Sequence, residues 1–398
     1  MLRVGIVGVG LRAGLVKLLP QMPGDPVLAV AVDPNPAGRE RGLAYGAPIA
    51  VASVEELADL GLDAAIVTSP DHAHAQQTVE LLKLGIPVFL EKPIAIDLAD
   101  ADLVLTTAYE TGTKLYVGHN MRHMEVIRTM KQLIDDGAIG EVKTVWCRHF
   151  VGNGGDFYFH DWHAERSKTD SLLLQKAAHD LDVIHYLAGG SGRLVSAMGD
   201  LMVYGSLGSR RTPGDEEDAK INEARELMGS WYSHDAWPPE TVTGLNPVID
   251  VEDVSMLNMR LDNGVLASYQ QCHFSPDYWR NYTVIGTHGR IENFGDGVGA
   301  VVKLWNRRGN YRAEPDAEYV IEQEGQGHSD ADAETLAEFF GFITQGIPTA
   351  TSPVAARDAV AVGLAATESL RNGSISVAIE PVSDELVRYF AAGQQLRK

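Results

Sequence analysis

Lys92 is the residue of this chain whose surroundings first suggest chemistry. It follows the apolar run Val-Phe-Leu at 88–90 and Glu91, and Pro93 comes directly after it. A short apolar run of this kind predicts a buried parallel strand, and open α/β sheets bind their ligands at the carboxyl ends of such strands. Because proline fixes the backbone of the turn, we expect Lys92 to lie at the mouth of a binding cleft. A solvated charge at a strand end is the alternative.

A glycine-rich segment near the start of the chain has the spacing of a phosphate-binding turn. After a first apolar run come Gly8, Gly10 and Ala13 in the pattern G-x-G-x-x-A, with Leu11 and Arg12 between them. The first glycine makes a tight turn, the second lets a pyrophosphate approach the backbone, and the small alanine lets the following helix pack closely. The N–H groups at the start of that helix would bind the phosphates. A plain strand-to-helix turn is the alternative.

A second apolar run, at 28–32, ends in Asp33, 20 residues beyond Ala13. That distance is typical of the carboxylate that binds the adenosine ribose hydroxyls of a dinucleotide. A carboxylate would also repel the 2′-phosphate of NADP, so NAD is favoured as the cofactor. Arg39 and Arg41 follow closely, so NADP stays possible. The alternative is that Asp33 only caps a turn.

Strands and helices alternate through the first third of the chain. Residues 63–68 and 114–118 are further apolar strand patterns, and residues 74–84 have helical spacing. This alternation is typical of a doubly wound parallel sheet. We expect the turn before the helix to line the cofactor crevice with Ser69, Pro70 and His74. Each histidine of that turn could equally make local hydrogen bonds at the helix start.

Composition excludes several classes of partner. The 398 residues contain 33 Lys and Arg against 54 Asp and Glu, a net charge of −21. Nucleic acid and anionic membranes both require a basic surface, so neither is an expected partner. Two cysteines in no metal-type spacing predict neither a disulfide framework nor a zinc site. With no signal peptide and no long apolar span, we expect a cytoplasmic protein.

An aromatic and polar tract occupies 152–163. Aromatic rings stack on sugar faces while polar groups bind hydroxyls, so the tract is typical of a carbohydrate-facing loop, with Trp162 as a candidate contact. Arg166 follows and would bind substrate or be solvated. His160 and His163 have a spacing seen in metal sites, but no cysteine or cluster of acids supports them, and no metal is predicted.

Residues 171–187 hold a second group of candidate functional side chains. Helical periodicity from 178 onward directs one apolar face to a core, namely Leu181, Ile184 and Leu187. His179 lies on the opening turn, aimed back toward the cleft; a satisfied core histidine is the alternative. Gln175 can bond a sugar hydroxyl but cannot accept a proton. Lys176 would bind substrate or lower the imidazole pKa of His179.

The rest of the second part is predicted to form a large, open, mostly antiparallel sheet. Strand patterns separated by turn residues occur at 142–150, 254–261, 265–273, 282–285 and 290–293. Helices are expected at 331–343 and 353–371, the latter capped by Ser352. One face of the sheet would pack on helices, and the other would be free to pair with another subunit.

An insertion at about 205–247 interrupts this pattern. A segment of this length is usually a lid, an interface arm or a mobile loop, and it contains a possible short helix at 219–228. Trp231 and Trp237 would be unusual on a solvated loop, so we expect part of the insertion to pack on a neighbour or over the cleft.

Taken in order, these motifs resemble the Gfo/Idh/MocA family of oxidoreductases. The resemblance is carried by Gly-Val-Gly-Leu-Arg-Ala at 8–13, Asp33, Ser-Pro-Asp-His-Ala-His at 69–74, Glu-Lys-Pro at 91–93 and Gly-His-Asn-Met-Arg at 118–122. It implies a Rossmann domain at 1–121 and an α+β domain at 122–398 for substrate binding and oligomerisation. In the family the open sheet resembles an interface, so a homodimer or homotetramer is expected.

The resemblance also implies roles. In the family the lysine of Glu-Lys-Pro reaches substrate and nicotinamide together, so Lys92 resembles the catalytic lysine, and Glu91 resembles the residue held against the nicotinamide-side ribose. In relatives with D-x-x-x-H-x-x-D here the histidine resembles the general acid/base. His179 and Asp182 match that pattern, whereas Gln175 stands where the first aspartate would be.

The expected site is therefore as follows. Cofactor-binding residues are Gly8, Gly10, Leu11, Arg12, Asp33, Ser69, Pro70, His74, Glu91, Lys92 and Asn120. Substrate-binding residues are Lys92, Arg122, Trp162, Arg166, Gln175, Lys176 and His179. Lys92 and His179 are the expected catalytic pair.

The expected activity is an NAD(P)-dependent dehydrogenase that oxidises a secondary hydroxyl of a sugar, glycoside or cyclitol. Three alternatives stay open. Some relatives use bound NAD to oxidise, eliminate and re-reduce, which makes them glycosidases without net redox change. Others oxidise non-sugar substrates such as dihydrodiols, imines or amines. A cofactor-binding regulator without catalysis is the third, although relatives of that kind would be expected to lose the lysine that this chain keeps.

Overall fold

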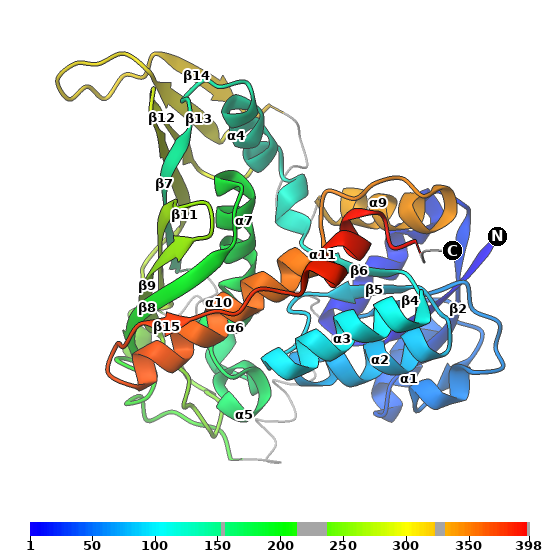
Figure 1. Cartoon of the computed structure of the whole chain (residues 1–398). Coiled ribbons are helices and arrows are strands. Elements are labelled where there is room, and N and C mark those ends of the chain that lie inside the picture. The colour runs from blue at the N-terminus through cyan, green and yellow to red at the C-terminus, as the bar shows by residue number, and fades with distance from the viewer. Residues whose placement is uncertain (153–155, 213–236, 323–330, 396–398) are drawn as a thin grey trace.

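The computed structural model describes residues 1–152, 156–212, 237–322 and 331–395. Within them the chain forms a sheet of six strands and a sheet of nine strands, with helices between and around them (Figure 1). This arrangement confirms the predicted α/β fold, a doubly wound parallel sheet joined to an α+β part with a large open sheet. No helix in the described part is long and apolar enough to cross a membrane.

The first sheet is parallel throughout, in the order β3-β2-β1-β4-β5-β6. Its strands are β1 (Leu2–Val7), β2 (Pro26–Val32), β3 (Ala50–Val51), β4 (Ala64–Val67), β5 (Val88–Glu91) and β6 (Leu115–Gly118). β4 and β5 are buried at every residue, which explains their continuous apolar sequence. The strand order reverses between β1 and β4, so the loops after β1, β4 and β5 meet at one edge, where such sheets bind ligands.

Helices cover both faces of this sheet. They are α1 (Pro36–Ala44), α2 (His74–Lys83) and α3 (Leu98–Thr111), with the 3₁₀ helices η1 (Leu11–Gln21), η2 (Val54–Leu57) and η3 (Asp71–Ala73). The segment after the glycine turn, expected to be a helix, is 3₁₀ along its whole length and contains Pro20, which has no N–H to donate. Ala13 is nevertheless fully buried, as predicted.

The second sheet has the order β14-β13-β12-β11-β7-β10-β9-β8-β15. Its strands are β7 (Val142–Val151), β8 (Gly192–Asp200), β9 (Val254–Leu261), β10 (Leu266–Cys272), β11 (Tyr278–Gly286), β12 (Arg290–Phe294), β13 (Val301–Trp305), β14 (Ala317–Val320) and β15 (Val377–Ala378). β7 and β10 are parallel, and the other described neighbours are antiparallel. The predicted hairpin is confirmed, with Gly264 in the turn at φ +85°.

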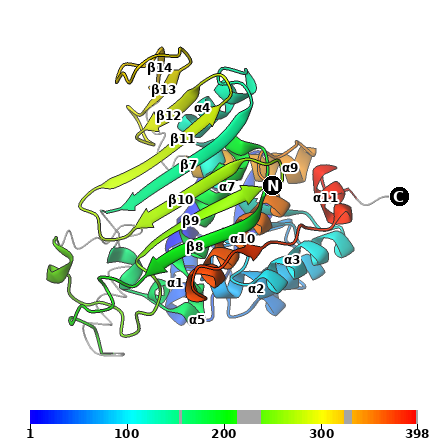
Figure 2. The same cartoon turned by 60° about the vertical axis from the view of Figure 1, so that its left-hand side comes forward.

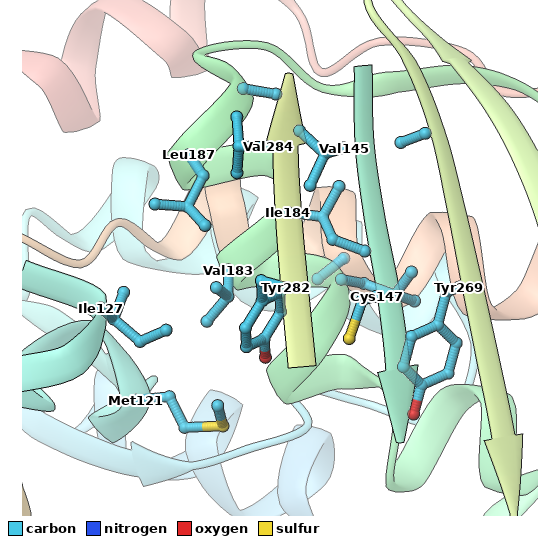
Figure 3. Packing of buried hydrophobic residues seen from close by; sticks show 14 of the residues in the cluster. Met121, Ile127, Val145, Cys147, Val183, Ile184, Leu187, Tyr269, Tyr282 and Val284 are labelled. Atoms are coloured by element: carbon cyan, nitrogen blue, oxygen red, sulfur yellow. The ribbon is translucent and has the colours of Figure 1, made fainter. Parts of the chain in front are cut away.

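Three helices cover the inner face of the second sheet: α4 (Glu125–Asp135), α7 (Ala178–Ala188) and α10 (Pro353–Arg371). Figure 3 shows Ile184 and Leu187 of α7 packed against Val145 of β7 and Val284 of β11. The predicted apolar face of α7 is confirmed, because Leu181, Ile184 and Leu187 are at most 1% exposed. This packing fixes the start of α7, where His179 lies.

The C-terminal helices return to the first sheet. Leu336, Phe339 and Phe340 of α9 (Ala331–Gln345) share a core with Ile6 of β1. Tyr389 of α11 (Asp384–Ala391) shares a second core with α3 and β5. In Figure 1 both helices lie beside the first sheet. The core of the first part is therefore completed by residues far beyond 121. The division of the chain into domains at 1–121 and 122–398 stays a prediction.

The remaining short elements are η4 (Asn120–His123), which follows β6, and η5 (Asp156–Phe159), η6 (Trp162–Ala164), α5 (Arg166–Thr169), α6 (Leu172–Gln175) and η7 (Pro239–Thr241), which lie within the second part. The described ends of the predicted insertion pack on this region, since Tyr204, Val242 and Leu245 share a core with Phe159. Trp237 is 52% exposed. The possible helix at 219–228 and Trp231 lie outside the described residues.

The outer face of the second sheet carries no helix within the described chain (Figure 2). Trp146, Met198, Met256 and Leu266 are between 46% and 63% exposed there. Met198 pairs with Met256 across β8 and β9, and Trp146 pairs with Ser268 across β7 and β10. The alternation of buried and exposed residues along β9 is the pattern of a strand with one free face.

Candidate active site

The glycine turn after β1 closely approaches the turn after β4. Gly8 has φ +82°, and a Cβ there would lie 2.4 Å from the Cα of Ser69, so only glycine fits. A Cβ on Gly10 would meet no atom within 4 Å, and Leu11 beside it is 37% exposed. The backbone at Gly10 is thus open to a ligand, as a pyrophosphate site requires.

Asp33 is held beside this turn by backbone donors. Its Oδ2 accepts from the N–H of Val9 at 2.8 Å, and its Oδ1 accepts from Asn35 at 2.8 Å. The ribose-binding and turn-capping interpretations are therefore compatible with one position of the carboxylate. Arg39 donates to the carbonyl of Asp33 at 2.8 Å, and Arg41 donates to that of Val9 at 2.8 Å. Both guanidinium groups lie within reach of this end of the site, so an NADP phosphate has candidate partners.

A network of charges joins the glycine turn to β5, β6 and α9. Arg12 donates to Glu91 at 3.0 Å and to Asp332 at 2.8 Å. Asn120 donates to the same Asp332 at 2.7 Å. The structure thus brings together three predicted cofactor residues, Arg12, Glu91 and Asn120. Asp332 was not predicted, because the sequence does not show that α9 returns to the first sheet.

Lys92 lies where the two parts of the chain meet. Its Nζ donates to the backbone carbonyl of Gln175 at 3.1 Å, and its peptide bond to Pro93 is cis. Burial lowers the pKa of Lys92, whereas the negative charge of Asp71 raises it. Asp71 is 5% exposed, and its Oδ2 has no hydrogen-bond partner in the described structure. Asp71 is a second functional candidate that sequence reasoning left as a turn residue.

His74 and Ser69 hold the turn that faces Lys92. The imidazole Nδ1 of His74 lies 2.7 Å from the carbonyl of Pro93, and its Nε2 lies 2.8 Å from that of Ser69. Ser69 Oγ contacts the Oε1 of Gln77 at 2.5 Å. Because both ring nitrogens face carbonyl oxygens, His74 ties the loop after β4 to the loop after β5. Contacts of Ser69, Pro70 and His74 with a cofactor stay predictions.

The segment before α7 approaches Lys92 from the second part. Gln175, Lys176 and His179 are buried, at 7%, 7% and 5% exposed. The Oε1 of Gln175 has no partner in the described structure. Lys176 is close enough for its charge to lower the pKa of Lys92. Lys92, Gln175 and Lys176 therefore form one cluster, with His179 on the first turn of α7.

The guanidinium of Arg122 is hydrogen-bonded to other residues of the protein. Its guanidinium makes two bonds to Asp182, at 2.7 and 2.6 Å, and donates to the carbonyl of Ala350 at 2.7 Å. His119, which was not predicted, lies 3.7 Å from Asp182. Burial lowers the pKa of His119, while Asp182 raises it. A contact of Arg122 with substrate stays a prediction, and the geometry shown is that of a structural ion pair.

The aromatic tract faces inward more than the sequence suggested. Phe159 is fully buried and stacks on Tyr204 with ring centroids 4.1 Å apart. Trp162 is half-buried and stacks on His163 at 3.7 Å. Arg166, 46% exposed in its side chain, pairs with Glu252 at 3.1 Å. Trp162 stays a candidate sugar contact, and Tyr158 and Phe159 belong to a small core against which Phe157 packs.

Tyr158 is the residue of this tract that reaches the lysines. It is 6% exposed, and the Nζ of Lys176 lies 5.5 Å from its ring centroid. Burial raises the pKa of Tyr158 to about 12, against the lowering effect of Lys92. Its hydroxyl is therefore protonated at neutral pH and available as a donor.

Neither candidate metal histidine has a metal-type setting. His160 contacts the carbonyl of Gly244 at 2.9 Å, and His163 contacts Asp161 at 2.5 Å. Among residues 1–152, 156–212, 237–322 and 331–395, no group of three His, Cys, Asp or Glu is placed to hold a metal ion.

A buried ion pair that the sequence did not reveal lies beneath the site. Asp180, on α7, lies 3.0 Å from Arg280 of β11 and 3.0 Å from the Nδ1 of His149 of β7. The hydroxyl of Tyr269 donates to it at 3.2 Å, and that of Tyr282 also donates to it. Burial raises the pKa of Asp180, but the charge of Arg280 and the hydrogen bonds from His149 and Tyr282 outweigh it and hold that pKa well below its usual range. Polar residues at inward positions of β7, β10 and β11 were the available signal.

Replacing Asp180 by Asn tests this cluster. The change leaves the Arg280 charge buried beside a neutral amide, which should lower the free energy of unfolding by about 3–5 kcal/mol. Because the pKa of Asp180 is lowered in the folded protein, its stabilisation is present at neutral pH and is lost as pH falls below about 4. Urea unfolding at pH 7 measures the change, with the exposed Asp59→Asn as control. Equal stability of the two variants would show that the pair contributes nothing.

Comparison with known proteins places this geometry in a family. Residues 2–119 match the family model described as "Oxidoreductase family, NAD-binding Rossmann fold", and residues 127–292 match "GFO/IDH/MocA C-terminal domain". The putative oxidoreductase YteT of Bacillus subtilis is 27% identical over 257 residues, which cover 58% of this chain and 60% of that protein. The 2,7-anhydro-N-acetylneuraminate hydratase of Mediterraneibacter gnavus is 30% identical over 188 residues, which cover 46% of this chain and 48% of that protein.

The chain thus aligns with between 48% and 60% of the length of these two curated relatives. A solved structure of levoglucosan dehydrogenase in complex with NADH superposes with a TM-score of 0.74, covering 96% of this chain and 100% of that chain. The identity is 18%, so this likeness shows the fold. The chain belongs to the Gfo/Idh/MocA family of oxidoreductases, and its N-terminal part is that family's NAD-binding Rossmann domain.

Proposed function

We propose that this protein is an NAD-dependent dehydrogenase that oxidises a secondary hydroxyl of a sugar, glycoside or cyclitol. The observation that carries the proposal is the contact of Lys92 Nζ with the Gln175 carbonyl at 3.1 Å. It brings the lysine at the ligand-binding edge of the first sheet to the segment that leads into His179. Polar groups from both parts, including the orphaned oxygens of Asp71 and Gln175, meet there.

The residues present fit a dinucleotide. Gly8 and Gly10 leave the backbone of the first turn accessible, and Asp33 offers a carboxylate beside it. Glu91 and Asn120 lie toward the substrate side, held through Arg12 and Asp332. Arg12, Glu91 and Asn120 would therefore hold the nicotinamide half of the cofactor. When bound, the nicotinamide supplies the acceptor for the hydride that leaves the substrate carbon.

Lys92 and His179 would both act on the substrate hydroxyl, each in a different role. An ammonium has three donors, and the Gln175 carbonyl accepts from Lys92 Nζ, so further donors are available for the substrate oxygen. Lys92 would thereby stabilise the negative charge that develops on this oxygen. His179 would take the hydroxyl proton as general base. Asp71 would keep Lys92 charged against the cost of burial.

Replacing Lys92 by Ala tests this assignment. Turnover should fall about 10²- to 10³-fold, since a positioned donor to the developing charge is lost. The affinity for NAD should change little, because the glycine turn and Asp33 are untouched. Absorbance of reduced nicotinamide with a panel of sugars, glycosides and inositols measures turnover, and calorimetry measures NAD binding. Lys83→Ala, on the exposed surface of α2, is the control; a Lys92→Ala enzyme that kept full turnover would refute the mechanism.

A redox-cycling enzyme without net oxidation is the second candidate. One relative, 30% identical over its aligned part, is named as a hydratase, and the addition of water is a reaction without net oxidation. Gln175, in place of the family's acid, also departs from the dehydrogenase pattern. NAD released from the denatured protein, together with cleavage of a chromogenic glycoside and a flat nicotinamide trace, would favour this activity over the dehydrogenase.

We further propose that two copies of the chain associate through the outer face of the second sheet, as a homodimer or within a homotetramer. Trp146, Met256 and Leu266 make this face apolar over β7, β9 and β10. Soluble monomers rarely expose apolar side chains contiguously on a broad flat surface. The self-complementary pairing of such a face about a two-fold axis would bury them.

Replacing Trp146 by Glu should reduce the assembled mass in solution. A charge at the centre of an apolar interface is not compensated in the assembly, so the association constant should fall at least about tenfold. Size-exclusion chromatography with light scattering gives the mass. Leu103→Glu, on an exposed and apolar position of α3, is the matched control and should leave the mass unchanged. A wild-type monomer would contradict the proposal outright.

A further inference from the structure

Lys176 is a buried cation that forms no ion pair with any residue the structure describes. The residue is 7% exposed, and no carboxylate of the described residues lies within 4.0 Å of its Nζ. Its Nζ lies over the ring face of Tyr158, 5.5 Å from the ring centroid. A buried ammonium is costly unless it is paired, and natural sites tolerate such a cost where a ligand supplies the partner.

The nearby acids are already committed to Arg280. Asp180 lies 3.0 Å from the Arg280 Nε and also faces His149, Tyr269 and Tyr282. Asp296 lies 3.2 Å from the Arg280 Nη1 and accepts from Tyr278 at 2.5 Å. Neither carboxylate lies within 4.0 Å of the Lys176 Nζ, so within the described residues Lys176 has no ion pair of its own, although both acids act on it at longer range.

Two buried imidazoles near Lys176 supply acceptors. The Nδ1 of His149 faces Asp180 at 3.0 Å, and the Nδ1 of His273 faces the carbonyl of Asp253 at 3.2 Å. Each Nδ1 must therefore carry the proton. Burial lowers the pKa of both rings to about 3, and Lys176 contributes to this, so each Nε2 is a bare acceptor. Neither Nε2 has a hydrogen-bond partner in the described structure.

Lys176 is also adjacent to the reacting group. Lys92 donates to the carbonyl of the preceding residue, Gln175, at 3.1 Å, and the charge of Lys176 acts on Lys92. A molecule held at Lys92 is thus within reach of Lys176. A fixed positive charge, protonated Tyr158 and two acceptor nitrogens together match an anion on a molecule that also carries hydroxyl groups.

We propose that the substrate is a sugar acid, whose carboxylate binds Lys176 while its hydroxyls are bound by neighbouring polar groups. This inference rests on the proposed function and names the substrate class for the same site. A carboxylate is favoured because one ammonium matches one negative charge, and a charge-assisted bond to it replaces the hydration that Lys176 loses on burial. A neutral sugar would leave the ammonium buried and unpaired.

The experiment compares sugar acids with their neutral counterparts at the same enzyme. Kinetics of NAD reduction are measured with D-glucuronate and D-galacturonate against D-glucose and D-galactose, for the wild type, Lys176→Met and the exposed Lys143→Met. We expect the wild type to prefer an acid in kcat/KM. Lys176→Met should raise the KM for the acid about 10- to 100-fold more than it raises the KM for the neutral sugar. A wild type that prefers neutral sugars, or a Lys176→Met enzyme that keeps the preference for acids, overturns the inference.

The pH dependence gives a readout that a structural role of Lys176 would not move. Burial and then Arg280 lower the pKa of Lys176 to about 7, whereas Asp180 and Asp296 raise it. The other titratable groups that face it are Lys92, His149, His273 and Tyr158. The charged form is lost as pH rises through about 7, so the preference for the acid over its neutral counterpart should fall about tenfold per pH unit above 7. The ratio cancels groups that act on both substrates, such as His179; a ratio flat from pH 6 to 9 contradicts the proposal.

Two further measurements separate a failure of this inference from other failures. The melting temperature of Lys176→Met should be equal to or above that of the wild type, because a desolvated charge is replaced by an apolar chain of similar shape. If no sugar of either kind reduces NAD, the dehydrogenase proposal fails. The inference is then decided by calorimetric titration of the same two acids into the wild type and Lys176→Met with NAD present, and an absence of Lys176-dependent binding overturns it.

Discussion

The hydrogen bond from Lys92 to the backbone of Gln175 is the contact on which the site depends. It is made between the carboxyl end of a parallel strand and a short helix that belongs to the other part of the chain. Neither part alone could hold an ammonium here, since the first supplies the lysine and Asp71 and the second supplies the acceptor. The acceptor is a main-chain carbonyl, so the position of Lys92 does not depend on the side chain at 175. Variation at this position could therefore change the substrate without moving the lysine.

The geometry beneath this contact is set by one fully buried carboxylate. Asp180 is reached from three strands of the second sheet, by His149, Tyr269, Arg280 and Tyr282. These groups fix the start of α7 against the sheet, and α7 carries His179 one residue before Asp180. In a medium of low dielectric constant such a network is strong when it is satisfied and costly when it is not. The rigid network around Asp180 thus fixes the position of His179, the candidate base.

Sequence reasoning succeeded where the chemistry is local. The glycine turn, Asp33 and the Glu-Lys-Pro turn follow β1, β2 and β5 of one parallel sheet, so the strand pattern sufficed to predict that they lie along the same edge. It failed where partners come from distant segments. Asp332 joins Arg12 from 320 residues away, and Arg280 joins Asp180 from a strand whose sequence shows only an alternation. The packing of the aromatic tract was not predictable for the same reason, because the stacking partner of Phe159, Tyr204, lies in a segment with no periodic signal. The composition of the tract indicated aromatic and polar side chains, but not which of them other segments of the chain would bury.

The departure at Gln175 gains a physical meaning from the charges around it. An acid at this position would lie next to Lys176 and close to Lys92, and it would neutralise part of their field. The amide leaves that field intact: within the described residues Asp71 faces Lys92, and Asp180 and Asp296 are held by Arg280. An acid at this position could pair with Lys176 from within the protein and would suit a neutral polyol. With Gln175 the Lys176 ammonium contacts no carboxylate of the described residues, and electrostatic complementarity then favours a ligand that brings a negative charge to it.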